Sequence, residues 1–118
     1  MAYDQVYGAE FAAAYDKQFT FFATHFAPRL RMLFDDHVAM QGCPKTLLDV
    51  ACGTGQLASE FLANGYRVVG IDLSPHMVEI ATRNNAKAVE SGQATFRVAD
   101  AASFSIDEPV SYAVSTFD

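Results

Sequence analysis

The sequence has few positive charges, and they do not gather anywhere along the chain. It contains 8 lysine and arginine residues against 14 aspartate and glutamate residues, so its formal net charge is −6 at pH 7. A protein that binds nucleic acid or an anionic membrane surface by electrostatic attraction needs a basic face. We therefore expect neither a nucleic acid nor a membrane as a partner.

Long hydrophobic runs, a secretory signal and paired cysteines are also missing. No apolar stretch approaches the ~18 residues that a membrane span requires. The first residues, MAYDQVYGAEF, have no basic segment and no continuous apolar segment. Cys43 and Cys52 do not form a CxxC motif, so we interpret them as reduced thiols and expect a cytoplasmic protein. The three histidines show no metal-ligand spacing, and we expect no metal site.

The pattern of the sequence changes near residue 45. Before this point, aromatic residues recur at steps of three or four, which predicts one face of a long helix that starts at Ala9: Phe11, Tyr15, Phe19, Phe22 and Phe26. Pro28 is typical of the first turn of a second, shorter helix. We expect residues 1–45 to form a helical cap and residues 46–118 to form a separate α/β unit.

After residue 45, short strands alternate with helices. The stretches TLLDVA, YRVVGID, ATFRVA and VSYAVST are predicted strands, whereas GQLASEFLAN and SPHMVEIATRNNAKAVE are predicted helices, the second with Ser74 as its N-cap. Such alternation is typical of a parallel sheet. Right-handed crossovers then give a doubly wound, Rossmann-like sheet with strand order 3-2-1-4. Ligands of such sheets bind outside the carboxyl ends of the strands.

The first strand leads directly into the glycine loop, ACGTG. Gly53 and Gly55 allow a tight turn and the close approach of a carboxylate or a phosphate. Asp72 ends the second strand, where a carboxylate can accept both hydroxyls of a ribose. Gly53, Gly55 and Ala58 match G-x-G-x-x-A, so an NAD-dependent oxidoreductase is one alternative. Asp49 favours a different ligand, because a buried charge needs a partner and an ammonium group beside the loop would supply one.

Four stretches of the sequence resemble class I S-adenosylmethionine-dependent methyltransferases. LLDVACGTGQLA is similar to the first motif of the family, VVGIDLSPHMVEIA to the second and FRVADAASF to the third, and VSYAVSTFD is similar to the fourth strand and the loop beside the methyl group. These parts occur in order between Thr46 and Asp118. The resemblance implies S-adenosylmethionine as cofactor, S-adenosylhomocysteine as product, and a small molecule as methyl acceptor. Ala51 stands where the family's first glycine is usual, and we expect little cost if that position is strand-like.

The resemblance also implies a role for individual residues along the cofactor. Asp72 would bind the ribose, and Asp100 with Ala101 would hold the adenine, while Leu73 and Met77 would pack on its faces. Three alternatives stay open: Asp72 as a cap at the strand end, Asp100 as a cap of a following turn, and Leu73 with Met77 as ordinary core. The expected cofactor-binding residues are Tyr15, Asp49, Ala51, Cys52, Gly53, Gly55, Asp72, Leu73, Met77, Asp100, Ala101 and Phe117.

Catalysis and assembly are less visible in the sequence. No residue is a clear general base, and no base pairs with Cys52, so we interpret that thiol as a small loop residue and leave the catalytic residues unknown. Family members continue with three more strands, so we expect a truncated fold whose fourth strand is an open edge. Such an edge, or the aromatic first helix, would pair two copies into a homo-oligomer. A non-catalytic cofactor-binding or assembly module is the third function that we consider.

Overall fold

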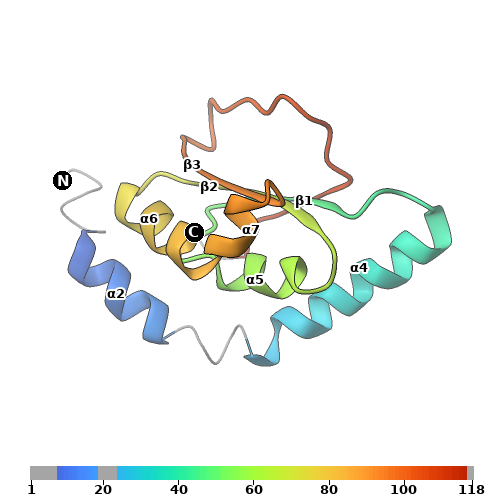
Figure 1. Ribbon diagram of the computed structural model, residues 1–118, viewed down its shortest axis with the longest axis horizontal. Helices are drawn as coiled ribbons and strands as arrows, with labels where there is room; N and C mark the ends of the chain where they lie inside the picture. The colour runs from blue at the N-terminus through green and yellow to red at the C-terminus, as the bar shows by residue number, and fades with distance from the viewer. Residues whose placement is uncertain (1–7, 19–23, 117–118) are drawn as a thin grey trace.

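Four parallel strands form the centre of the protein (Figure 1). The structure is a computed structural model that describes residues 8–18 and 24–116, without the side chains of residues 15–18. The strands are β1 (Thr46–Val50), β2 (Arg67–Asp72), β3 (Ala94–Val98) and β4 (Tyr112–Val114). They pair in the order β3-β2-β1-β4, which confirms the predicted topology.

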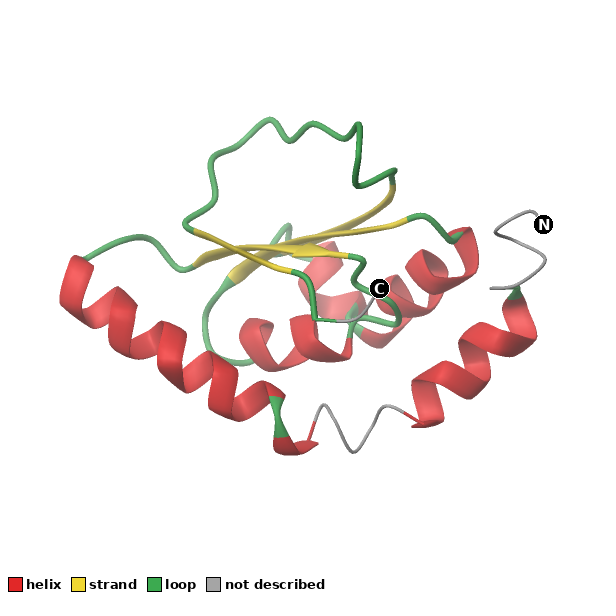
Figure 2. Cartoon of the chain, turned by 180° about the vertical axis from the view of Figure 1, so that it is seen from behind, coloured by secondary structure: helices red, strands yellow, loops and turns green. Residues whose placement is uncertain are grey.

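The helices of the described residues gather on one face of this sheet. They are α2 (Ala9–Gln18), α4 (Ala27–Gln41), α5 (Gln56–Leu62), α6 (Pro75–Asn84) and α7 (Ala86–Glu90). Figures 1 and 2 show these helices on one side, while the irregular segment 99–111 arches over the other side. Pro28 lies in the first turn of α4, as predicted. Residues 19–23 lie outside the described residues, so the continuity of the predicted first helix stays a prediction.

The single helix that we predicted over residues 74–90 is two helices. Asn85 separates α6 from α7 with a backbone conformation of φ −124° and ψ 35°. Its side-chain amide donates to the carbonyl of Ala81 at 3.0 Å and to that of Gly55 at 3.3 Å. An asparagine side chain that bonds to the backbone competes with helical hydrogen bonds, which explains why the helix ends here. The start of α6 agrees with the prediction, because the Ser74 hydroxyl accepts the N–H of Met77.

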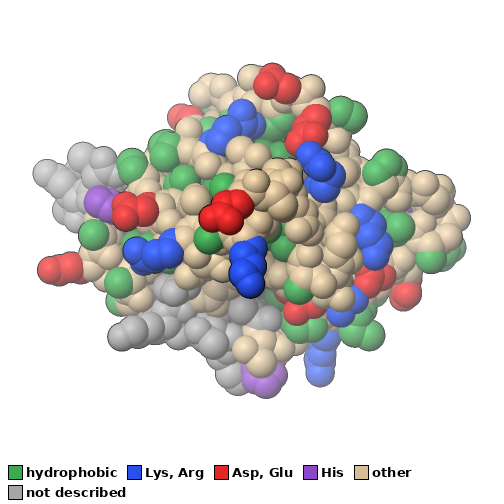
Figure 3. All heavy atoms as spheres, viewed as in Figure 1, with side chains coloured by type: hydrophobic (Ala, Val, Ile, Leu, Met, Phe, Trp, Pro, Cys, Tyr) green, Lys and Arg blue, Asp and Glu red, His purple; other side chains and the backbone are tan. Residues whose placement is uncertain are grey.

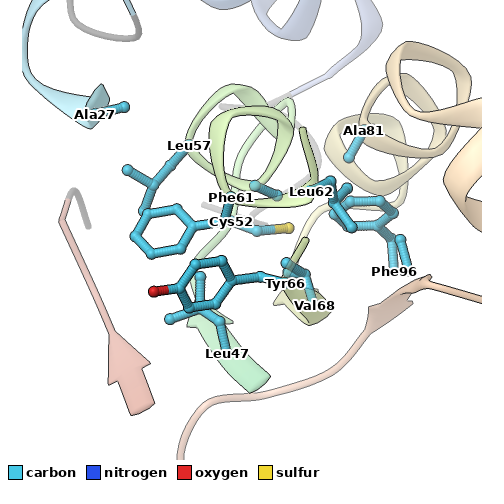
Figure 4. Close-up of a cluster of buried hydrophobic side chains, with 12 residues drawn as sticks. Ala27, Leu47, Cys52, Leu57, Phe61, Leu62, Tyr66, Val68, Ala81 and Phe96 are labelled. Carbon is cyan, nitrogen blue, oxygen red and sulfur yellow. The ribbon is translucent and has the colours of Figure 1, made fainter. Parts of the chain in front are cut away.

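The main core lies between the sheet and the helices. Phe61 of α5 and Tyr66, which precedes β2, are both fully buried, and their rings meet edge to face with centroids 4.9 Å apart. Such a pair stabilises a core by about 1 kcal/mol beyond the area that it buries. Figure 4 shows these two rings together with Leu47 and Val68, which point from the sheet toward α5. The strand pattern therefore places the apolar side chains of β1 and β2 under the helices.

Helix α4 is attached to this same core by polar contacts. Arg31 Nε donates to Glu60 of α5 at 2.9 Å, and the Tyr66 hydroxyl donates to Asp35 at 2.8 Å. Phe34 packs against the buried cluster from the same helix. The division into a cap and an α/β unit at residue 45 stays a prediction.

The surface shows no single dominant charge on the face drawn in Figure 3, where basic side chains are separated by acidic and apolar ones. Within residues 8–18 and 24–116, no helix is long and apolar enough to cross a bilayer. In the same ranges, no group of three histidine, cysteine, aspartate or glutamate side chains is placed to hold a metal ion. The expected absence of a metal stays a prediction.

Candidate functional site

The glycine loop leaves the carboxyl end of β1 in an unusual backbone conformation. Ala51, Gly53 and Gly55 all have positive φ angles, of 58°, 57° and 79°. The left-handed region costs a residue with a Cβ atom roughly 1–2 kcal/mol. We expected Ala51 to cost little on condition that its position is strand-like. That condition is not met, so Ala51 adds strain where a glycine would add none.

Gly55 is required by its surroundings as well as by its angle. A Cβ atom at this position would lie 2.9 Å from Asn85 Nδ2 and 3.0 Å from the Cβ atom of Ala81. Both distances are shorter than ordinary van der Waals contact. The glycine therefore lets the loop approach the end of α6, while it also serves as the N-cap residue of α5.

Asp72 lies at the end of β2 and binds the loop directly. Its Oδ2 accepts the N–H of Gly53 at 2.9 Å, and its Oδ1 accepts the N–H of Ser74 at 2.9 Å. The carboxylate thus ties the glycine loop to the start of α6, so the strand-end cap that we considered as an alternative is present. Ribose binding by Asp72 is compatible with this geometry and stays a prediction.

Asp49 lies in β1, two residues before the glycine loop, with 2% of its surface exposed. Its Oδ2 has no hydrogen-bond partner in the part of the chain that the structure describes. Burial, and then the negative charge of Asp72, raise the pKa of Asp49 to about 7. Burial and the same two carboxylates raise the pKa of the Cys52 thiol well above its usual value. A protonated, buried thiol agrees with our interpretation of Cys52 as a small loop residue.

Thr54 is a second buried polar residue of the loop, and the sequence analysis missed it. Its hydroxyl is only 1% exposed and, among the described residues, has no hydrogen-bond partner. A buried polar atom without a partner costs roughly 1–3 kcal/mol. Thr54 lies between the two glycines of the motif, and this position was the available signal. The loop therefore holds a carboxylate oxygen and a hydroxyl that a polar ligand would satisfy.

The adenine side of the predicted site is open to solvent. Leu73 is 44% exposed, and Asp100 and Ala101 are exposed. Asp100 Oδ1 accepts the N–H of Ala102 at 2.9 Å, so the turn-capping alternative is present in this structure. Val98 is 52% exposed and is the register partner of Asp72, which makes it an apolar neighbour that we did not predict. Exposed apolar side chains at the ends of β2 and β3 suit a flat aromatic ring.

Three other predicted residues are either buried away from this opening or lie outside the described part of the chain. Met77 is buried with Ala12 and Ile80 between α2 and α6, which is the ordinary core packing that we kept as an alternative. The side chain of Tyr15 and the whole of Phe117 lie outside the described residues. The roles of Met77, Tyr15 and Phe117 toward a cofactor therefore stay predictions.

Several proteins described as methyltransferases are similar to this chain. An O-methyltransferase of Pyrenophora dematioidea is 38% identical over 56 residues, which cover 47% of this chain and 21% of that protein. A solved structure from Methanococcus maripaludis has a TM-score of 0.72 at 21% identity, over 91% of this chain and 49% of that one, and this likeness shows the fold alone. A methyltransferase of Thiobacillus denitrificans, solved with S-adenosyl-L-homocysteine, is 31% identical with a TM-score of 0.54, over 62% of this chain and 30% of that one. The present chain thus spans about half or less of each of these proteins.

A family profile described as "Methyltransferase domain" matches residues 47–118. This match begins at the second residue of β1 and includes the glycine loop, Asp72 and all of β2, β3 and β4. The sheet order β3-β2-β1-β4 is a partial Rossmann-like methyltransferase fold. The chain therefore belongs to the Methyltransferase domain family.

Proposed function

We propose that this chain is the S-adenosylmethionine-binding part of a methyltransferase that acts on a small molecule. The observation that carries the proposal is the Asp49 carboxylate, which is buried in β1 two residues before the glycine loop and has no partner for Oδ2 among the described residues. A buried charge without a partner is costly, and a ligand that brings a cation removes the cost. The ammonium group of a bound S-adenosylmethionine is such a cation.

The other residues of the site fit the remaining parts of this cofactor. The Thr54 hydroxyl is a buried polar group for the methionine end, Asp72 places a carboxylate at the end of β2 for the ribose, and Leu73 with Val98 offers apolar surface to the adenine. When bound, the cofactor would supply the activated methyl group. The residues of this chain would hold and orient that group, and alignment of reacting groups supplies much of the rate of a displacement reaction.

A nicotinamide dinucleotide fits the same residues less well. Its pyrophosphate would bring negative charge toward Asp49 and Asp72, which are both buried at the loop. The loop from Asp49 to Gln56, DVACGTGQ, contains no lysine or arginine that would offset that charge. Like charges in a poorly solvated site repel strongly. We therefore favour S-adenosylmethionine over NAD as the cofactor.

Ligand binding tests the proposal without a known acceptor. S-Adenosylhomocysteine should raise the melting temperature of the chain, because a ligand that binds only the folded state stabilises it by about 2.7 kcal/mol at 100 times its dissociation constant. NAD at the same concentration should have no effect. Asp49→Asn should weaken the binding of S-adenosylhomocysteine in calorimetric titration. Asp36 is an exposed acid on α4, and Asp36→Asn should leave this binding unchanged. Tighter binding of NAD than of S-adenosylhomocysteine would contradict the proposal.

A further inference from the structure

Two buried carboxylates share the face of the sheet that the helices cover. Asp49 lies two positions after Leu47, which points from β1 toward α5 (Figure 4). In the parallel register Asp49 pairs with Gly70 of β2, and Asp72 follows two positions later on that strand. Side chains two positions apart point to the same face of a strand, so both carboxylates point to one side. The two acids are only 2% and 6% exposed, so water screens their charges poorly.

The two carboxylates differ in the hydrogen bonds that they accept. Asp72 accepts the N–H of Gly53 and the N–H of Ser74, each at 2.9 Å. The Oδ2 atom of Asp49 is buried and has no hydrogen-bond partner in the part of the chain that the structure describes. A negative charge is therefore stabilised at Asp72 and left without such support at Asp49.

Among the described residues, no positive charge offsets that of Asp49. Burial, with the charges of the two carboxylates, raises the pKa of the Cys52 thiol in the loop well above its usual value, so this neighbour stays neutral. On β4 the register partner of Asp49 is Val114, which carries no charge. Helix α5 has one ionisable residue, Glu60, and it is paired with Arg31 of α4 at 2.9 Å. The charge that acts on Asp49 is thus the negative charge of its neighbour on β2.

The free protein should therefore keep Asp49 neutral in mildly acidic solution. Burial, and then the negative charge of Asp72, raise the pKa of Asp49 to about 7. A cation beside the carboxylate has the opposite effect, because an opposite charge favours the ionised form. Below pH 7 the α-amino group of S-adenosylmethionine is an ammonium ion and is such a cation. A proton and the ammonium group therefore compete for the same carboxylate.

We propose that binding of S-adenosylmethionine displaces a proton from Asp49, so that affinity for the cofactor is controlled by pH between about pH 5 and pH 7. The inference rests on the proposed function. The O–H bond of the Asp49 carboxyl group breaks, the proton passes to the solvent buffer, and the ammonium group pairs with the carboxylate without a change in its own charge. Because linkage is reciprocal, the bound cofactor keeps Asp49 ionised at pH values at which the free protein holds the proton.

Calorimetry with S-adenosylhomocysteine, which carries the same ammonium group, measures this proton directly. At pH 6 the heat of binding should depend on the ionisation enthalpy of the buffer, with a slope of about one released proton per ligand. Affinity should fall about tenfold from pH 6 to pH 5, as one linked proton requires. Asp49→Asn holds no such proton. Its heat of binding should not depend on the buffer, and its affinity should be the same at both pH values.

A histidine variant is the matched control for this measurement. Histidine is the other side chain that ordinarily titrates between about pH 5 and pH 8, and His76 lies in the first turn of α6. His76→Gln should keep both the proton release and the pH profile of the wild-type chain. Proton release that persists in Asp49→Asn and disappears in His76→Gln would assign the proton to the histidine and overturn the inference.

The possible outcomes separate the two proposals. Binding of S-adenosylhomocysteine to the wild-type chain without proton release would overturn the inference and leave the proposed function standing. An affinity that falls as pH rises from 5 to 7 would also overturn it, because a protonated Asp49 would then donate a hydrogen bond to the ligand. A wild-type chain that does not bind S-adenosylhomocysteine at neutral pH would overturn the proposed function and this inference with it. The buffer dependence of the wild-type chain decides the question even if Asp49→Asn does not fold.

Discussion

At the scale of single residues, the glycine loop combines a strained alanine with a buried acid. Ala51 has a φ angle of 58°, in a region that glycine adopts freely. Ala51→Gly should therefore raise the free energy of unfolding by on the order of 1 kcal/mol, which is the relief of left-handed strain less the greater entropy of glycine in the unfolded chain. Urea denaturation measures the change.

The residue that follows α5 offers a matched control for this substitution. Ala63 ends α5 with a φ angle of −64°, which alanine adopts without strain. Ala63→Gly should lower the free energy of unfolding by roughly 0.5–1 kcal/mol, because only the entropic effect of glycine remains. Equal losses at both positions would mean that the left-handed conformation of Ala51 carries no cost.

The buried acid predicts how stability depends on pH. The pKa of Asp49 is raised to about 7 in the folded protein, from an ordinary value of 3.8, by burial and by the charge of Asp72. Between these two values the unfolded chain has released the proton that the folded chain retains, so stability falls as pH rises from about 4 to about 7. The effect is on the order of 4 kcal/mol at most.

Asp49→Asn should remove this part of the pH dependence. The variant should be more stable than the wild type near pH 7.5, and the two proteins should have similar stability near pH 4, because asparagine stays neutral at every pH. Denaturation curves over this range give the comparison. The free energy of unfolding of both proteins could instead rise by the same amount between pH 5 and pH 7. That result would show that Asp49 does not titrate in this range.

At the scale of elements, α4 is attached to the core by a hydrogen bond between a buried tyrosine and a half-buried aspartate. The Tyr66 hydroxyl donates to Asp35 at 2.8 Å, and Tyr66 is fully buried. Tyr66→Phe keeps the ring and removes this bond, so it should lower the free energy of unfolding by about 1–2 kcal/mol. In an Asp35→Ala background the same change should cost much less. A double-mutant cycle by urea denaturation gives the coupling, and a coupling near zero would contradict the attachment.

Elements with strong local patterns were predictable, and those decided by distant contacts were not. Strands that alternate with helices, together with right-handed crossovers, predicted the order of β1, β2, β3 and β4. The end of α6 was missed because it depends on a bond from Asn85 to Gly55, thirty positions away along the chain. Ala51 was misjudged for a related reason, since its backbone angle is set by the turn around it. For Met77 the sequence left core packing and cofactor contact both open, because its packing partner Ala12 lies in a different helix.

At the scale of the whole molecule, apolar surface remains uncovered. The free edge of β4 has no strand beside it among the described residues. Exposed apolar side chains lie on α4 and just before it: Phe26, Met32, Leu33 and Met40. We propose that copies of the chain associate through one of these surfaces, while association through the aromatic first helix, of which residues 19–23 lie outside the described part, stays a prediction. Light scattering over a concentration series should then give a mass above 12.9 kDa that rises with concentration.

Charged substitutions distinguish the two surfaces. Leu33→Lys with Met40→Lys should restore the monomer mass if α4 is the contact, because both side chains are exposed and their loss should leave the fold intact. Unchanged association in this variant would point to the β4 edge. A constant mass near 12.9 kDa up to millimolar protein would contradict association through either surface.

The strand order also bears on the sequence of folding events. Strands β1, β2 and β3 are complete once residue 98 has been synthesised, and β2 pairs with both of its neighbours. Strand β4 pairs with β1 through only three residue pairs, from Leu47–Tyr112 to Asp49–Val114, after the whole intervening chain has been made. Closing so long a loop for so few contacts is slow. We therefore expect the first three strands to form before β4 joins the free edge of β1, and we expect the amides of β4 to be the first of the sheet to exchange with solvent.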